Sequence, residues 1–128
     1  MKKIFALLAI ILLMLTSCSS KGEVMNMSSA DFAKKIHEPG IVVLDVRTPE
    51  EFSGPHIHGA LNIDFEAGNF KEKISHLDKS ATYAVYCRSG RRSALAIETM
   101  KEVGFTSLVN LSDGINDWTS NGFPVENS

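Results

Sequence analysis

The sequence has few cysteines, only Cys18 and Cys87 among 128 residues. A disulfide network is therefore excluded as its framework, and a chain of this length can bury enough apolar surface to fold without one. It also lacks an excess of basic residues, with 13 Lys and Arg against 15 Asp and Glu. Because a nucleic-acid-binding protein needs a basic face, this balance argues against nucleic acid as a partner. A hydrophobic content of 44% with 22% charged residues excludes a disordered chain and indicates one globular domain.

No apolar run in the sequence is long enough to span a membrane as a helix. The longest, Ile4–Leu15, has 12 residues, whereas a span needs about 20. This run follows Lys2 and Lys3 and ends at Leu15-Thr16-Ser17-Cys18, an order typical of a bacterial secretion signal. We therefore expect a signal peptide over residues 1–17. The mature chain then keeps 11 basic residues against 15 acidic ones, a net charge of about −4.

The Leu-Thr-Ser-Cys ending resembles the lipobox of bacterial lipoproteins, in which the cysteine becomes the acylated first residue. The resemblance implies that Cys18 carries more than one acyl chain, which is enough for stable membrane anchoring. Residues 18–27 would form the tether, at most about 30 Å long when extended. We therefore expect the folded domain, residues 28–128, to lie close to a membrane in the cell envelope, facing the periplasm or the cell exterior. An ordinary signal peptide, with Cys18 merely near the cut, is the alternative.

Strand and helix patterns alternate along residues 28–128. Ser28 and Asp31 predict the start of a helix that runs to about His37. Apolar runs at 41–46 and 82–86 predict strands buried on both faces of a sheet. This alternation is typical of parallel β-α-β units, so we predict an α/β fold. The remaining strands are expected at 61–63 and 108–111, and the remaining helices at 50–52, 69–77, 93–103 and 115–120.

The chemistry of the sequence is concentrated in Cys87-Arg88-Ser89-Gly90-Arg91-Arg92-Ser93, between a predicted strand and a predicted helix. Ligands bind at this end of the strands in open parallel sheets, and N–H groups ahead of a helix are unpaired. Gly90 permits a tight curl, and an arginine at about 5 Å would favour the Cys87 thiolate by roughly 3 kcal/mol at a dielectric of about 20. We therefore predict that Cys87 is a nucleophile for a small anion. If Cys18 is acylated, Cys87 has no partner in the chain, so a second molecule must resolve its covalent adduct.

Several segments of the sequence resemble those of a known family, the single-domain rhodaneses, which are sulfurtransferases. The segment 87–93 resembles their active-site loop. The segments 44–52 and 56–63 resemble their upstream signature, and 114–118 with 122–125 resemble their closing segment. The resemblance covers about residues 27–125 and implies a three-layer domain, with a central, mainly parallel sheet flanked by helices. The sequence departs from the family pattern at Pro55, His58, Asp64 and Asp113, which puts local loop geometry in question.

The resemblance also implies a reaction. Cys87 would take the outer sulfur of thiosulfate or a similar anionic donor as a persulfide, and cyanide or a thiol would then accept that sulfur. No cofactor and no metal is needed, and the sequence places no third ligand beside His56 and His58. We expect Asp45 and Arg47 to form a structural salt bridge, and Trp118 with Phe123 to belong to the core. The substrate-binding residues implied by the loop are Arg88, Ser89, Gly90, Arg91 and Arg92, with Arg91 the weaker candidate.

Two other functions remain open at this stage. Cysteine phosphatases and arsenate reductases have five residues between their cysteine and the arginine of the loop, whereas Arg92 lies five positions after Cys87, with only four between them. The shorter loop favours a sulfur-sized ligand over a tetrahedral oxyanion. The second alternative is a catalytically weak rhodanese-like module that binds a partner or senses redox state at the cell envelope.

Overall fold

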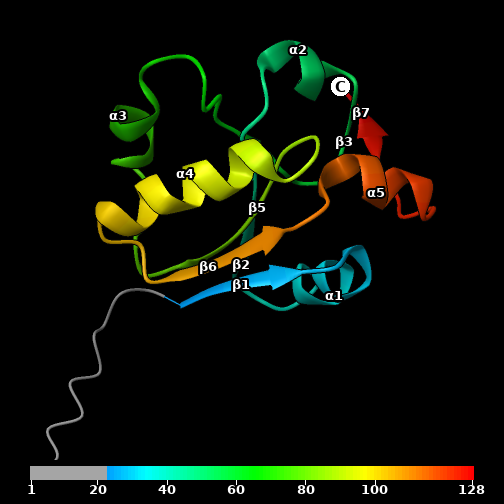
Figure 1. The fold of residues 1–128 in the computed structure, drawn as a ribbon, viewed down its shortest axis with the longest axis horizontal. Coiled ribbons are helices and arrows are strands. Elements are labelled where there is room, and N and C mark those ends of the chain that lie inside the picture. The colour runs from blue at the N-terminus through cyan, green and yellow to red at the C-terminus, as the bar shows by residue number, and fades with distance from the viewer. Residues whose placement is uncertain (1–22) are drawn as a thin grey trace, which may run out of the picture.

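Five parallel strands form the central sheet of the structure, a computed structural model in which residues 23–128 are described. Because β2 (Ile41–Asp45) and β5 (Thr82–Tyr86) lie inside this sheet and pair on both sides, their apolar runs are buried on both faces. The predicted α/β fold is thereby confirmed (Figure 1). In spatial order the strands are β1 (Glu23–Met27), β6 (Ser107–Leu111), β5 (Thr82–Tyr86), β2 (Ile41–Asp45) and β4 (Leu61–Asn62).

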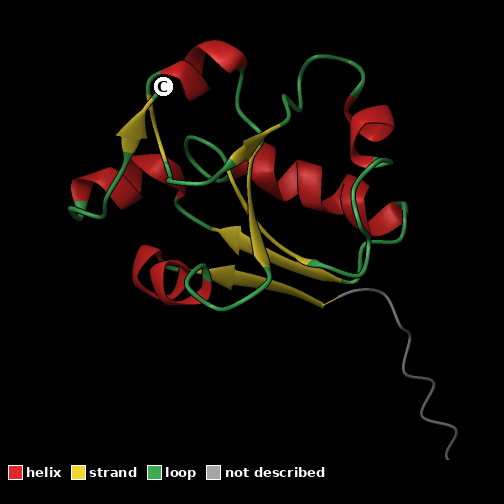
Figure 2. Cartoon of the chain, turned by 180° about the vertical axis from the view of Figure 1, so that it is seen from behind, coloured by secondary structure: helices red, strands yellow, loops and turns green. Residues whose placement is uncertain are grey.

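Helices cover both faces of the sheet, so that the strands lie between helical layers (Figure 2). One face packs against α1 (Ser29–Lys35) and α5 (Gly114–Ser120), and the other against α3 (Phe70–Ile74) and α4 (Arg91–Glu102). The short helix α2 (Pro49–Ser53) lies near the carboxyl ends of the strands and contacts β3 (Pro55–His56). The helices begin and end within a few residues of the predicted positions.

The two faces of the sheet bury separate apolar cores, as strand β5 illustrates. Tyr83 and Val85 point into the core formed with α3 and α4, whereas Ala84 and Tyr86 point into the core formed with α1 and α5. Trp118 of α5 is 1% exposed and packs against Phe123, as expected for a core residue. Alternating side chains of one strand therefore tie both helical layers to the same sheet.

The sheet begins earlier in the chain than the sequence indicated. We expected residues 18–27 to be a tether, but Glu23–Met27 form strand β1, which pairs in parallel with all of β6. Strand β1 lies at an edge of the sheet, and Met25 and Asn26 are exposed. An edge strand of this kind lacks the continuous apolar pattern of a central strand. The signal peptide at residues 1–17 and the acylation site Cys18 lie outside the described residues.

A second, antiparallel sheet joins β3 to the C-terminal strand β7 (Glu126–Asn127). Glu126 Oε1 lies 3.3 Å from His56 Nε2, and Glu126 Oε2 lies 2.5 Å from His58 Nδ1. The hydrogen bond that His58 donates to Glu126 raises the pKa of His58. These contacts hold the end of the chain beside α2. Across residues 23–128, no helix has both the length and the hydropathy needed to cross a membrane.

Candidate active site

Cys87 directly follows β5, at the carboxyl end of the central strands, and is the sole cysteine among residues 23–128. Its side chain is buried, with 1% of the residue exposed. The backbone N–H of Gly90 donates to Sγ at 3.1 Å, and Sγ lies 3.4 Å from the hydroxyl of Ser93. Ser93 in turn donates to the Gly90 carbonyl at 3.1 Å. The sulfur therefore lies inside the loop that leads into α4, facing an N–H donor.

Two glycines let this loop curl against the neighbouring loop before α5. Gly90 has φ of 99°, and a Cβ there would lie 1.9 Å from the carbonyl oxygen of Ser112. Gly114 has φ of 68°, and a Cβ there would lie 2.2 Å from the carbonyl oxygen of Arg88. No side chain fits either contact, so both positions require glycine.

The start of α5 binds the carbonyl groups of the cysteine loop. The N–H of Ile115 donates to the Cys87 carbonyl at 2.9 Å, and the N–H of Asn116 donates to the Arg88 carbonyl at 3.1 Å. With its carbonyls held in this way, the loop keeps its N–H groups for a ligand. Five N–H groups of this loop have no protein acceptor within the described part of the chain, those of Arg88, Ser89, Arg91, Arg92 and Ser93.

The three arginines of the loop have different surroundings. Arg92 is partly buried and forms a two-pronged ion pair with Glu51, at 2.7 Å and 2.9 Å, while its Nε lies 3.7 Å from Glu66. Arg88 and Arg91 are exposed and form no ion pair with any residue from 23 to 128. Arg88 lines a hollow of about 230 Å³, and Arg91 lines a separate one of about 380 Å³. The free positive charge at the loop surface therefore belongs to Arg88 and Arg91.

Glu51, which the sequence analysis did not assign to the site, connects α2 to the cysteine loop. Its backbone N–H donates to Thr48 Oγ1 at 3.3 Å, and its carboxylate accepts from the Thr48 N–H at 3.4 Å, so the two residues form a capping box. The hydrogen bonds from Arg92 lower the pKa of the Glu51 carboxyl to about 2. The spacing Thr-x-x-Glu marks the cap in the sequence, but nothing local indicates the contact with Arg92, 41 residues away.

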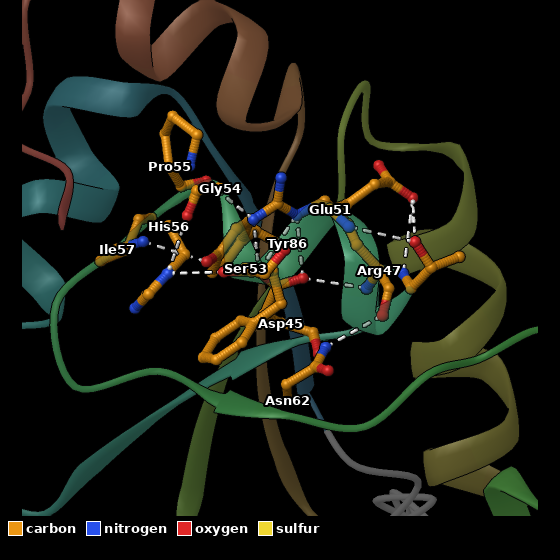
Figure 3. A network of polar contacts seen from close by, with 12 residues as sticks. Asp45, Arg47, Glu51, Ser53, Gly54, Pro55, His56, Ile57, Asn62 and Tyr86 are labelled. Carbon is orange, nitrogen blue, oxygen red and sulfur yellow. Dashed lines mark hydrogen bonds and ion pairs between the residues drawn. The ribbon is translucent and has the colours of Figure 1, made fainter. Parts of the chain in front are cut away.

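A buried polar network beneath α2 supports the cysteine loop (Figure 3). Asp45 and Arg47 form the expected salt bridge at 2.7 Å, with 0% and 5% exposure. Arg47 also donates to the Pro55 carbonyl at 3.0 Å, and the Tyr86 hydroxyl accepts from the Ile57 N–H at 3.1 Å. Tyr86 directly precedes Cys87, so the network fixes the end of β5 from which the cysteine projects.

The His56 ring is held beside this network by backbone carbonyls of the preceding residues. Its Nδ1 lies 2.8 Å from the Phe52 carbonyl, and its ring stacks on Phe52 with centroids 4.1 Å apart. In the stretch from Glu23 to the C-terminus, no group of three His, Cys, Asp or Glu side chains is placed to hold a metal ion.

Comparisons with known proteins agree with this geometry. The profile of the Rhodanese family, the rhodanese-like domain, matches residues 28–121. The chain is 40% identical over 76 residues to thiosulfate sulfurtransferase PspE of Escherichia coli, covering 58% of this chain and 70% of that protein. It is 37% identical over 93 residues to the chloroplastic thiosulfate sulfurtransferase 16 of Arabidopsis thaliana, covering 65% and 78%. The 32% identity to the putative sulfur carrier protein YrkF of Bacillus subtilis extends over 80% of this chain but only 55% of that protein.

Solved structures give the same result. A rhodanese-related protein from Thermoplasma volcanium superposes with a TM-score of 0.70 at 32% identity, covering 81% of this chain and 99% of that one. A rhodanese with anions from E. coli gives a TM-score of 0.58 at 34% identity, covering 69% and 99%. The fold, the cysteine loop and the matched residues together show that the chain belongs to the rhodanese-like domain family and has thiosulfate sulfurtransferases among its relatives.

Proposed function

We propose that the protein is a sulfurtransferase in which Cys87 carries a sulfane sulfur from an anionic donor to a thiophilic acceptor. The observation that carries this proposal is the placement of Cys87 Sγ within the loop, 3.1 Å from the Gly90 N–H and next to N–H groups without an acceptor. Such donors stabilise the negative sulfur of a thiolate or a persulfide. The names of two relatives, each called a thiosulfate sulfurtransferase, support thiosulfate as the donor.

The reaction has two displacement steps and needs no external oxidant. The Cys87 thiolate attacks the outer sulfur of thiosulfate, a new S–S bond forms, and sulfite leaves with the electron pair of the broken bond. Cyanide or a thiolate then attacks the terminal sulfur of the persulfide, giving thiocyanate or an acceptor persulfide. The Cys87 thiolate leaves with its electrons, so the enzyme returns to its starting state.

The three arginines of the loop have different roles in this proposal. Arg88 and Arg91, which are exposed and unpaired within residues 23–128, attract and bind the anionic donor. Arg92 contributes positive charge near Cys87 while Glu51 holds its guanidinium in place. Ser89 and Gly90 supply N–H groups to the ligand, and Ser93, whose hydroxyl donates to the Gly90 carbonyl, holds the loop around Sγ.

Intact mass spectrometry tests the proposal directly. Incubation with thiosulfate should add about 32 Da, one sulfur atom, and cyanide should remove it. Cys87→Ser should gain no mass while keeping the circular dichroism spectrum of the parent protein. A folded parent protein that gains no mass would refute sulfur transfer. That outcome would favour the alternative, a catalytically weak module that binds a partner or senses redox state; the burial of the Cys87 thiol supports its low reactivity.

We further propose that the chain is lipid-anchored through Cys18 at the cell envelope, on the strength of the leader sequence alone. Metabolic labelling with radioactive palmitate should label the parent protein in the membrane fraction. Cys18→Ala should lose both the label and the membrane association. A parent protein that stays unlabelled, or a labelled Cys18→Ala variant, would refute the anchor.

A further inference from the structure

A hollow of about 850 Å³ lies away from the cysteine loop. Its floor contains Val43, Ile57 and Trp118, which belong to the core on the α1 and α5 face of the sheet. Cys87 belongs to the core on the opposite face. The proposed sulfur transfer therefore makes no use of this hollow, whose lining includes residues of α1 and α5.

The walls of the hollow present carbon rather than polar atoms. The Trp118 indole N–H already donates to the Pro124 carbonyl at 2.9 Å, and its ring packs at 4.8 Å against Phe123. The Ile57 N–H is likewise bonded to the Tyr86 hydroxyl. With these donors satisfied inside the protein, the floor offers contact only to an apolar ligand.

The rim of the hollow is basic. Lys34, His37 and His58 line it, and no Asp or Glu does. His58 is paired with Glu126, so the positive charge left for a ligand is that of Lys34. Lys34 is exposed and forms no ion pair with a residue of the described range, whereas Nδ1 of His37 faces the Ala33 carbonyl. This arrangement complements a negative charge at the mouth of an apolar site.

We propose that this hollow binds a free aliphatic carboxylate, with its hydrocarbon chain along the partly exposed side chains of Ala33, Ile36 and Phe123 and its carboxylate at Lys34. The volume falls within the range of about 300–1,000 Å³ that is usual for small-molecule sites. Since each buried methylene contributes about 0.8 kcal/mol, binding should tighten roughly fourfold per added CH₂ until the hollow is filled.

Trp118 provides the assay, because it is the only tryptophan of the chain and forms part of the floor. The full chain is titrated with 12-bromododecanoate below its micellar concentration, and quenching of Trp118 fluorescence is followed. We expect saturable 1:1 quenching that dodecanoate reverses better than decanoate. Dodecan-1-ol should compete more weakly because it carries no negative charge. Dodecylammonium should compete more weakly still, because its positive charge is repelled by Lys34.

Three variants test the location of the site. Lys34→Glu should weaken binding by about two- to fivefold, the range expected for an exposed ion pair. Ala30→Leu adds an apolar side chain at an exposed helical position of the rim, and should abolish binding by filling the mouth. Lys73→Glu, an exposed position on α3 at the other face, is the matched control and should bind like the parent protein.

Several results would overturn the proposal. These are absence of quenching, equal displacement by dodecylammonium, and equal binding by all three variants. A dimer in sedimentation that Ala30→Leu dissociates would identify a second copy of the chain as the occupant. All three variants should retain mass gain from thiosulfate, so a failure here is distinguishable from a failure of the proposed sulfur transfer.

Discussion

Loss of the ion pair between Glu51 and Arg92 should lower the stability of the protein, by an amount that decreases as the pH falls. A fall of the Glu51 pKa from 4.5 to about 2 corresponds to roughly 3 kcal/mol of favourable interaction, at about 1.4 kcal/mol per pKa unit. Because 25% of the Glu51 side chain is exposed, solvent screening reduces this to about 1–2 kcal/mol. Glu51→Gln removes the charge but keeps the capping box with Thr48, since glutamine also fits that position. The substitution therefore isolates the ion pair.

The direction of this pH dependence follows from the lowered pKa of the Glu51 carboxyl. A carboxyl whose pKa is lowered on folding stabilises the protein above its unfolded pKa, and this stabilisation disappears as the pH falls towards the folded pKa. We therefore expect Glu51→Gln to be less stable than the parent protein by about 1–2 kcal/mol from pH 7 down to about 5. The difference should shrink below pH 4.5 and be nearly absent at about pH 2.

Urea unfolding followed by Trp118 fluorescence measures this difference at pH 7, 5, 3.5 and 2.5. Glu50→Gln is the matched control, because Glu50 lies beside Glu51 in the same first turn of α2 but is exposed and forms no ion pair with any residue in the described range. The control should match the parent protein at every pH to within about 0.5 kcal/mol. Equal stability of Glu51→Gln and the parent protein at pH 7, or a difference that persists undiminished at pH 2.5, would refute the reasoning.

Three further predictions concern the loop, the buried network and the C-terminal strand. Gly90→Ala should abolish mass gain from thiosulfate, because its Cβ collides with a backbone carbonyl at 1.9 Å, and a fully active variant would contradict this geometry. Asp45→Asn should cost about 3–5 kcal/mol in urea unfolding, since it leaves the Arg47 charge buried without a counter-charge, and a loss below about 1 kcal/mol would contradict that reasoning. In an NMR titration the pKa of His58 should lie above its ordinary value and fall in Glu126→Gln, whereas an unchanged pKa would show that this ion pair is absent in solution.

The parts of the fold that the sequence predicted are those whose signal is local. The run Thr82–Tyr86 is a strand over the predicted residues, and a Ser28 cap begins α1 as expected. Strand β1 was missed because its reason to be a strand is its pairing with β6, 84 residues further along the chain. The two-residue strands β3 and β7 are too short to show any periodicity.

The candidate site shows the same limit. The cysteine loop could be identified because nucleophile, glycine and arginines lie within six consecutive residues. The sequence alone did not distinguish the surroundings of its arginines, because Glu51 and Arg92 lie 41 positions apart in the chain. In the same way, Glu126 faces His58 only because the last strand of the chain returns to β3.

Strand β1 also determines where the domain can be trimmed. A chain shortened to begin at Ser28, the boundary that the sequence indicates, would lack Glu23–Met27 and leave β6 as the edge of the sheet. Leu108, Val109 and Leu111 of β6 are almost completely buried, and its backbone groups would then face solvent unpaired. An open edge of this kind invites pairing with other molecules and aggregation. A shortened protein should therefore begin before Glu23.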